Sequence, residues 1–196
     1  GGFSEPPSRF AGFCGLVWEG RAMGKHAIGV AVSDAIRERD FAALVRQFDA
    51  DPYRTRRVLK QLACAPDDPD HGYVVAAFRV LSSERSAKMP EFFLETMRRS
   101  LWEMNEEGGN VAWSAPEIVA AVVAGAPDRF GSFASYLVMA ALGEPTFRPS
   151  LRAAVRLLDE VDSSLLREHR EDLENAGVLL PSEDSRKAAL PFGAAR

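Results

Sequence analysis

The stretch WEMNEEGGNVAWSAPE, residues 102–117, combines two tryptophans with acidic residues and two adjacent glycines. Tryptophan is enriched at the positions where protein interfaces concentrate their binding energy. Trp102, Asn105, Glu106 and Trp113 are therefore candidate residues of a recognition surface. The chemistry that these residue types predict is non-covalent binding of another protein.

The same stretch also has a structural interpretation. Ser114 and Glu117 have the S-x-x-E spacing of a capping box, in which each side chain bonds a backbone amide of the new helix, and Pro116 suits its first turn. Gly108 and Gly109 can adopt the positive φ angles that end a helix. The sequence leaves both interpretations open, and the structural one accounts for more of the stretch.

Four residues in a row have side chains that bind metals: Asp67, Asp68, Asp70 and His71. Prolines interrupt the row, and capping of a helix accounts for Asp70, so we expect no metal site there. None of the three histidines has a second ligand at helical spacing, which disfavours zinc. The sequence thus predicts neither a metal nor another cofactor.

The usual signatures of enzymes are missing from the sequence. It contains no G-x-S-x-G, no glycine-rich phosphate loop and no G-x-G-x-x-G. Arg54, Arg57 and Lys60 lie along one side of an expected helix, and a solvated face is the simpler interpretation than a phosphate or acidic-partner site. The net charge of −4 disfavours nucleic acid as a partner, because the surface as a whole repels a phosphate backbone.

Composition predicts a cytoplasmic protein with a sizeable core. Hydrophobic residues make up 46% of 196. Cys14 and Cys64 are far apart in sequence, so we expect reduced thiols. Charges interrupt every apolar run, so no membrane span is expected. Residues 1–26 lack the pattern of a signal peptide and are interpreted as an N-terminal extension, partly foreign to the natural chain if Met23 is the natural start.

Helical periodicity dominates from residue 27 onward. Asp40, Asp51 and Asp70 are predicted to cap three successive helices. The strongest periodicity follows Pro90, where four apolar residues share one face: Phe93, Met97, Leu101 and Met104. The segment APEIVAAVVAGA after the 102–117 stretch is apolar nearly all round, which predicts burial on several sides.

Four more helices are expected toward the C-terminus. They cover 127–143, a segment from Pro149 or Ser150 to Val161, 163–174 and 182–195. The first is predicted to turn four residues inward: Phe133, Tyr136, Leu137 and Ala140. The total is about nine helices with short links, and such links place neighbouring helices antiparallel, as helical hairpins.

Internal similarity favours an open stack over a closed bundle. LRAAVRLL at 151–158 and SRKAALPF at 185–192 lie 34 residues apart, within the range of helical solenoids. A turn, an arginine and an alanine-rich helix also recur in DPYRTRRVLKQLA, RPSLRAAVRLL and SEDSRKAALPFGAA. On these segments the chain resembles the HEAT-repeat and armadillo-like proteins over 27–196, and the 102–117 stretch is similar to one in a group of bacterial HEAT-like proteins. The resemblance implies an all-α fold, a single α-solenoid domain over 27–196, and no particular chemistry.

Stacked hairpins bury a continuous core and leave an extended concave surface. We therefore expect a non-enzymatic interaction or scaffold module that binds another protein. The alternative is an enzyme on the same scaffold, since some HEAT-like proteins resemble chromophore lyases and others alkylated-base glycosylases. A glycosylase requires a basic groove, and only the residues from Arg54 to Lys60 favour one.

Overall fold

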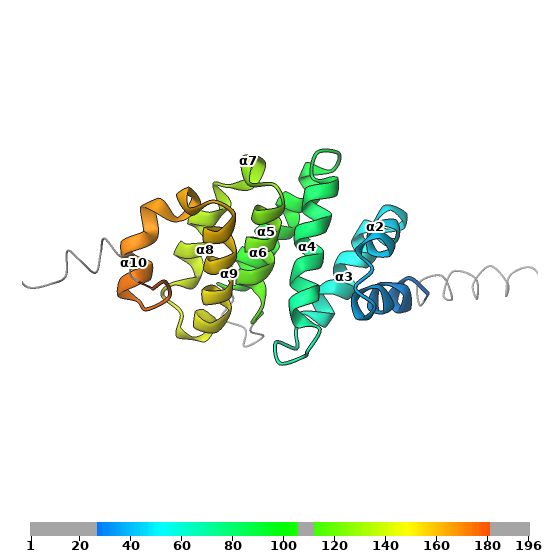
Figure 1. Cartoon of the computed structure of the whole chain (residues 1–196), viewed down its shortest axis with the longest axis horizontal. Coiled ribbons are helices and arrows are strands. Elements are labelled where there is room, and N and C mark those ends of the chain that lie inside the picture. Colours follow the sequence, from blue (N-terminus) through cyan, green and yellow to red (C-terminus); the bar gives the residue numbers. More distant parts are fainter. Residues whose placement is uncertain (1–26, 106–111, 181–196) are drawn as a thin grey trace, which may run out of the picture. The chain divides into compact units, whose positions relative to one another are not determined.

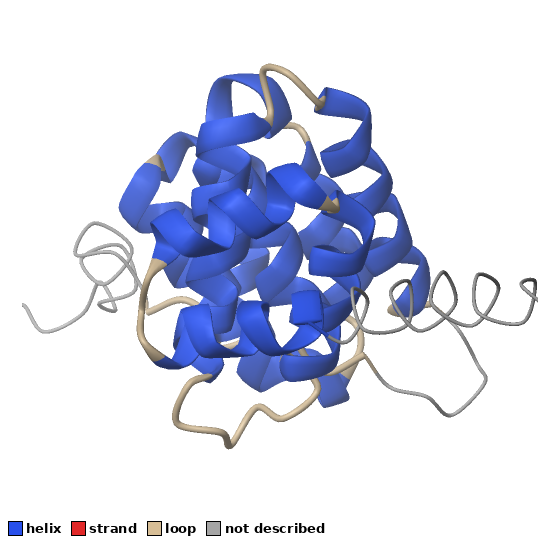
Figure 2. Ribbon diagram, turned by 90° about the vertical axis from the view of Figure 1, so that its right-hand side faces the viewer, coloured by secondary structure: helices blue, strands red, loops and turns tan. Residues whose placement is uncertain are grey.

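A computed structural model of the chain describes residues 27–105 and 112–180. Every regular element in these ranges is a helix (Figure 2), so the all-α prediction is confirmed for the part described. The chain divides after Leu62 into two compact units, Gly1–Leu62 and Ala63–Arg196. The helix expected over 182–195 lies outside the described residues, and the single solenoid domain over 27–196 stays a prediction.

The first unit contains a helix over 27–37, followed by α2 (Phe41–Ala50) and α3 (Pro52–Leu62). Leu44 and Leu59 are completely buried, as their positions on the apolar faces of α2 and α3 predict.

Two of the three predicted aspartate caps are confirmed. The backbone amide of Ala43 donates to Asp40 Oδ1 at 2.8 Å, and that of Arg54 donates to Asp51 Oδ1 at 2.9 Å. The side chain of Asp70 makes no capping hydrogen bond, so this prediction was wrong. Asp70 has helical backbone angles, φ −88° and ψ −3°, instead of the extended ones that are typical of an N-cap residue. Its own amide donates to Asp68 Oδ1 at 2.8 Å.

These caps give a direct comparison of two substitutions. Asp40→Ala is expected to lower the free energy of unfolding by about 1 kcal/mol, because it removes the acceptor for an amide of the first turn. Asp70→Ala is expected to change it by less than about 0.5 kcal/mol. Urea unfolding followed by circular dichroism measures both. Equal losses for the two variants would contradict the cap assignments.

The second unit contains most of the helices, joined by short links. Its elements are α4 (His71–Arg85), α5 (Pro90–Glu103), α6 (Ala115–Gly125), α7 (Pro127–Phe130), α8 (Phe133–Ala141), η1 (Pro145–Phe147), α9 (Arg148–Val161), η2 (Ser163–His169) and α10 (Arg170–Asn175).

Helix α6 is the centre of this unit. It contacts α4 and α9 on its two sides and also packs on α5 and α8. Figure 1 shows α4, α6 and α9 side by side, each beginning toward the lower edge of the view. Ile118 to Ala124 are buried without exception, which confirms the prediction from the apolar sequence. The helices α5, α8 and η2 form a second row of contacts, α5 with α8 and α8 with η2.

The helices α4 and α6 run parallel and approach closely near their C-terminal ends. Ser82 Oγ donates to the carbonyl oxygen of Val122 at 2.7 Å in a buried hydrogen bond. A Cβ atom added at Gly125 would lie 2.3 Å from the carbonyl oxygen of Arg79. The absence of a side chain at Gly125 therefore permits the two backbones to pack together.

Three predictions about the C-terminal half were wrong in detail. The segment 127–143 forms α7 and α8 rather than one helix, and α8 leaves the Tyr136 side chain 57% exposed instead of inward. The helix expected from Pro149 or Ser150 begins at Arg148, directly after η1. The segment 163–174 begins as the 3-10 helix η2, with Asp162 Oδ1 accepting from the Ser164 amide at 2.9 Å.

Among the described helices, none combines the length and the apolar character needed to cross a membrane.

Candidate functional site

Two tryptophans lie exposed on either side of the link between α5 and α6. The Trp102 side chain, in the last turn of α5, is 69% exposed, and that of Trp113, just before α6, is 48% exposed. Asn105 is also exposed, and its Nδ2 donates to the Leu101 carbonyl oxygen at 2.9 Å, so it caps its own helix. The fourth predicted residue, Glu106, lies outside the described residues.

Buried neighbours fix the backbone beside both tryptophans. Met104 is 5% exposed and anchors the end of α5, as its place on the predicted apolar face requires. Ser114 is 4% exposed, and its Oγ donates to the carbonyl oxygen of Ala63 at 2.5 Å. This hydrogen bond joins the link that precedes α4 to the residue next to Trp113.

The predicted capping box is wrong. Ser114 occupies the N-cap position of α6 but makes no side-chain capping hydrogen bond. Its hydroxyl donates to Ala63 instead, and the Glu117 carboxylate pairs with His71. Both side chains bond residues distant in sequence instead of backbone amides of α6, because Ser114 faces the link before α4 and Glu117 faces α4 itself.

His71 and Glu117 form a shielded pair between the first turns of α4 and α6. His71 Nε2 and Glu117 Oε2 are 2.6 Å apart, and their side chains are only 12% and 13% exposed. A carboxylate oxygen only accepts hydrogen bonds, so the proton of this bond resides on Nε2. The pair fixes the two helix starts relative to each other.

The other ring nitrogen of His71 is buried and has no hydrogen-bond partner among the residues that the structure describes. The pair lies 46 residues apart in sequence, so no local spacing could have identified it. The sequence indicated this pair only through the polar types of its two residues. A histidine and a glutamate in the first turns of two helices become neighbours only if those helices are parallel, and the parallel packing of α4 and α6 is not visible in the sequence.

The turn before α4 is acidic and exposed. Asp67 and Asp68 both have exposed side chains. Across residues 27–105 and 112–180, no group of three or more His, Cys, Asp or Glu side chains is arranged to hold a metal ion.

A serine and a histidine also meet between α8 and η2. Ser135 Oγ and His169 Nε2 are 2.6 Å apart and partly buried. Serine with an adjacent base is the beginning of a nucleophilic site, which also requires a third group that orients the base. In the part of the chain that is described, no carboxylate pairs with His169, so the contact links η2 to α8 without completing such a site.

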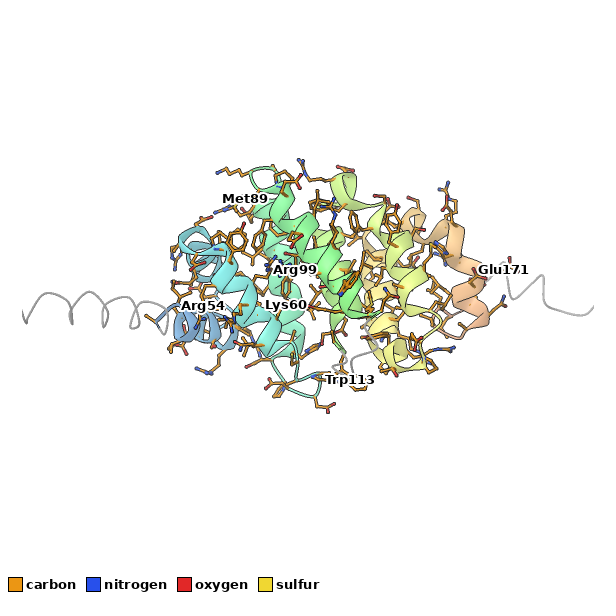
Figure 3. The ribbon with its side chains drawn as sticks, turned by 180° about the vertical axis from the view of Figure 1, so that it is seen from behind. Arg54, Lys60, Met89, Arg99, Trp113 and Glu171 are labelled. Atoms are coloured by element: carbon orange, nitrogen blue, oxygen red, sulfur yellow. The ribbon has the colours of Figure 1, made fainter. Side chains whose placement is uncertain are left out.

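The basic residues of α3 lie in the first unit (Figure 3). Arg57 is exposed, and Arg54 is half-buried beside Gly29. The Nε atom of Arg54 is buried and has no hydrogen-bond partner within 27–105 and 112–180. The Arg56 guanidinium lies 5.6 Å from the centre of the Tyr53 ring.

The second unit thus presents two exposed indoles next to backbone that buried contacts hold in place. Comparisons of the chain with protein-family models, with curated proteins and with solved structures found no match.

Proposed function

We propose that this chain is a non-enzymatic interaction module of the HEAT-repeat type, acting in the cytoplasm, that binds another protein through the surface around Trp102 and Trp113. The order of helix contacts in the second unit supports the repeat type. Each helix of the row α4, α6 and α9 contacts the next member of the row, and the row α5, α8 and η2 does the same. Helical hairpins stacked in series have this order of contacts.

The exposure of the two indoles is the observation that carries the proposal. Large aromatic side chains are costly to leave in water, and exposed ones near rigid backbone are typical of binding surfaces. Trp102 and Trp113 are exposed although Met104 and Ser114, their neighbours in sequence, are buried. The fold thus keeps these residues at the surface without needing their side chains for its core.

Substitution of both tryptophans separates binding from stability. Trp102→Ala combined with Trp113→Ala is expected to change the free energy of unfolding by less than about 1 kcal/mol, because exposed side chains contribute little to the core. Loss of partner capture is expected to be at least tenfold, since interface tryptophans typically contribute about 2 kcal/mol or more each. Thermal unfolding and affinity capture from the source cells, followed by peptide identification, measure the two effects.

Tyr136→Ala combined with Met139→Ala is the matched control. Both residues lie on α8 with exposed side chains, so this variant removes a similar apolar area from another surface. It is expected to capture the same proteins as the unchanged chain. Full capture by the tryptophan variant, or an equal loss in the control, would contradict the proposal.

The alternative, an enzyme similar to chromophore lyases or alkylated-base glycosylases, makes its own predictions. A glycosylase binds duplex DNA at low salt, with affinity that falls as salt rises. We expect no DNA binding in a fluorescence titration even at low salt, because the net charge is −4. A lyase of this type would retain a tetrapyrrole, visible as colour in the purified protein.

A further inference from the structure

The two links next to Trp113 carry charges of one sign. The described residues of the two links and their borders, 63–70, 102–105 and 112–117, contain no lysine or arginine. They contain five acidic residues: Asp67, Asp68, Asp70, Glu103 and Glu117. The whole chain has 24 basic residues in 196, so their absence from this edge is a local property.

Two of these charges are exposed on the link that a hydrogen bond attaches next to Trp113. His71 pairs with Glu117, which removes that carboxylate from the exposed set. Asp67 and Asp68 are exposed on the link that begins at Ala63. The Ala63 carbonyl oxygen accepts the Ser114 hydroxyl, so this link is attached to the residue that follows Trp113.

Figure 3 shows Trp113 at the lower edge of the second unit, next to this link. The face of an indole ring attracts cations such as a guanidinium or an ammonium group. Carboxylates near the ring add attraction that depends on salt. An indole with two outward carboxylates therefore favours a positively charged group with an apolar stem, which describes arginine and lysine side chains.

We propose that Trp113, Asp67 and Asp68 form a docking surface for an arginine- or lysine-rich segment of a partner protein. The inference rests on the proposed binding function and specifies the chemistry of the partner. Nucleic acid and anionic membrane are disfavoured as occupants, because both carry the same sign of charge as the two exposed aspartates.

Three short fluorescent peptides test the charge of the occupant. They share one leucine and alanine framework and differ only in carrying arginine, serine or glutamate at the remaining positions. Fluorescence anisotropy with the full chain is expected to detect binding of the arginine peptide, at least tenfold tighter than that of the other two at low salt. Its affinity is expected to fall several-fold at moderate salt.

Matched variants locate the binding. Asp67→Asn combined with Asp68→Asn removes two charges, and its side-chain oxygens still accept hydrogen bonds. This variant and Trp113→Ala are each expected to weaken the arginine peptide about tenfold. The control is Glu171→Gln combined with Asp172→Asn, which removes two exposed charges from α10, away from Trp113 (Figure 3). It is expected to leave the affinity within twofold.

Each contrary result has a defined meaning. Trp113-dependent binding of the serine or glutamate peptide at equal affinity would overturn the basic-partner inference and leave the binding function standing. Equal weakening by the α10 control would overturn the location, because attraction to the net charge alone would then explain the binding. Failure of all three peptides would also overturn the inference, whereas the proposed function is decided separately by the capture experiment with Trp102→Ala and Trp113→Ala.

Discussion

Gly125→Ala is expected to lower the free energy of unfolding by about 3 kcal/mol, because the added methyl group has no space. Its Cβ would lie 2.3 Å from the Arg79 carbonyl oxygen and 2.7 Å from Ser82 Cβ. The nearest atom belongs to the backbone of α4, so a side-chain rotation cannot relieve the contact. The helices α4 and α6 would have to separate, which would also stretch the buried hydrogen bond from Ser82 to Val122.

Thermal unfolding measures this effect, and a loss of this size corresponds to a fall in Tm of about 6–12 °C for a domain of this size. Gly72→Ala is the control, since Gly72 also lies in a helix and a Cβ atom there would meet nothing within 4 Å. It is expected to keep or slightly raise the stability, because alanine favours helix more than glycine does. A Gly125→Ala variant as stable as the unchanged chain would contradict the close packing of α4 on α6.

Glu117→Ala is expected to lower the free energy of unfolding by about 2 kcal/mol. A hydrogen bond to a charged group typically contributes about 1.5–3 kcal/mol, and the two side chains of this pair are only 12% and 13% exposed. The loss arises because the shielded Nε2 of His71 would have no acceptor. Urea unfolding of the single variant measures it.

A pair of double-mutant cycles decides between the observed contact and the capping box that the sequence predicts. Glu117→Ala with His71→Ala is expected to show a coupling energy of about 1–2 kcal/mol, because the two side chains bond directly. Glu117→Ala with Ser114→Ala is expected to show a coupling below about 0.5 kcal/mol, because Ser114 bonds Ala63 instead. The reverse order of couplings would restore the capping box.

The sequence was sufficient where apolar residues repeat on one face of a helix with a charged opposite face. In α9, four apolar residues that recur at helical spacing are all buried: Leu151, Ala154, Val155 and Leu158. The exposed positions of this helix include Arg152, Arg156 and Glu160. The uniformly apolar α6 was equally predictable, since such a segment can only be surrounded by other helices.

The sequence was insufficient where a helix is apolar on several faces and the fold buries only some of them. In α8 the segment FASYLVMAA offers more than one possible inward face, so periodicity selected Tyr136 while the structure buries Val138. The neighbours of a helix determine its inward face, and a single sequence does not contain them.

The sequence indicated the residue types of the candidate site but not the contacts that hold the neighbouring backbone in place. Trp102, Trp113 and Asn105 stood out by composition alone, and all three are at the surface. The contacts that hold their surroundings in place, from Ser114 to Ala63 and from His71 to Glu117, span 51 and 46 residues of sequence. Such contacts depend on the parallel packing of α4 and α6, which local spacing does not encode.

Photo-crosslinking in the source cells tests the central claim most directly. A photoreactive phenylalanine analogue placed at position 113 is expected to form a covalent adduct with a partner protein, because the side chain there projects from the proposed binding surface. The same analogue at position 136, an exposed site on α8, is expected to form none with that partner. Adducts of equal yield at both positions, or none at position 113, would contradict the assignment of this surface to protein binding.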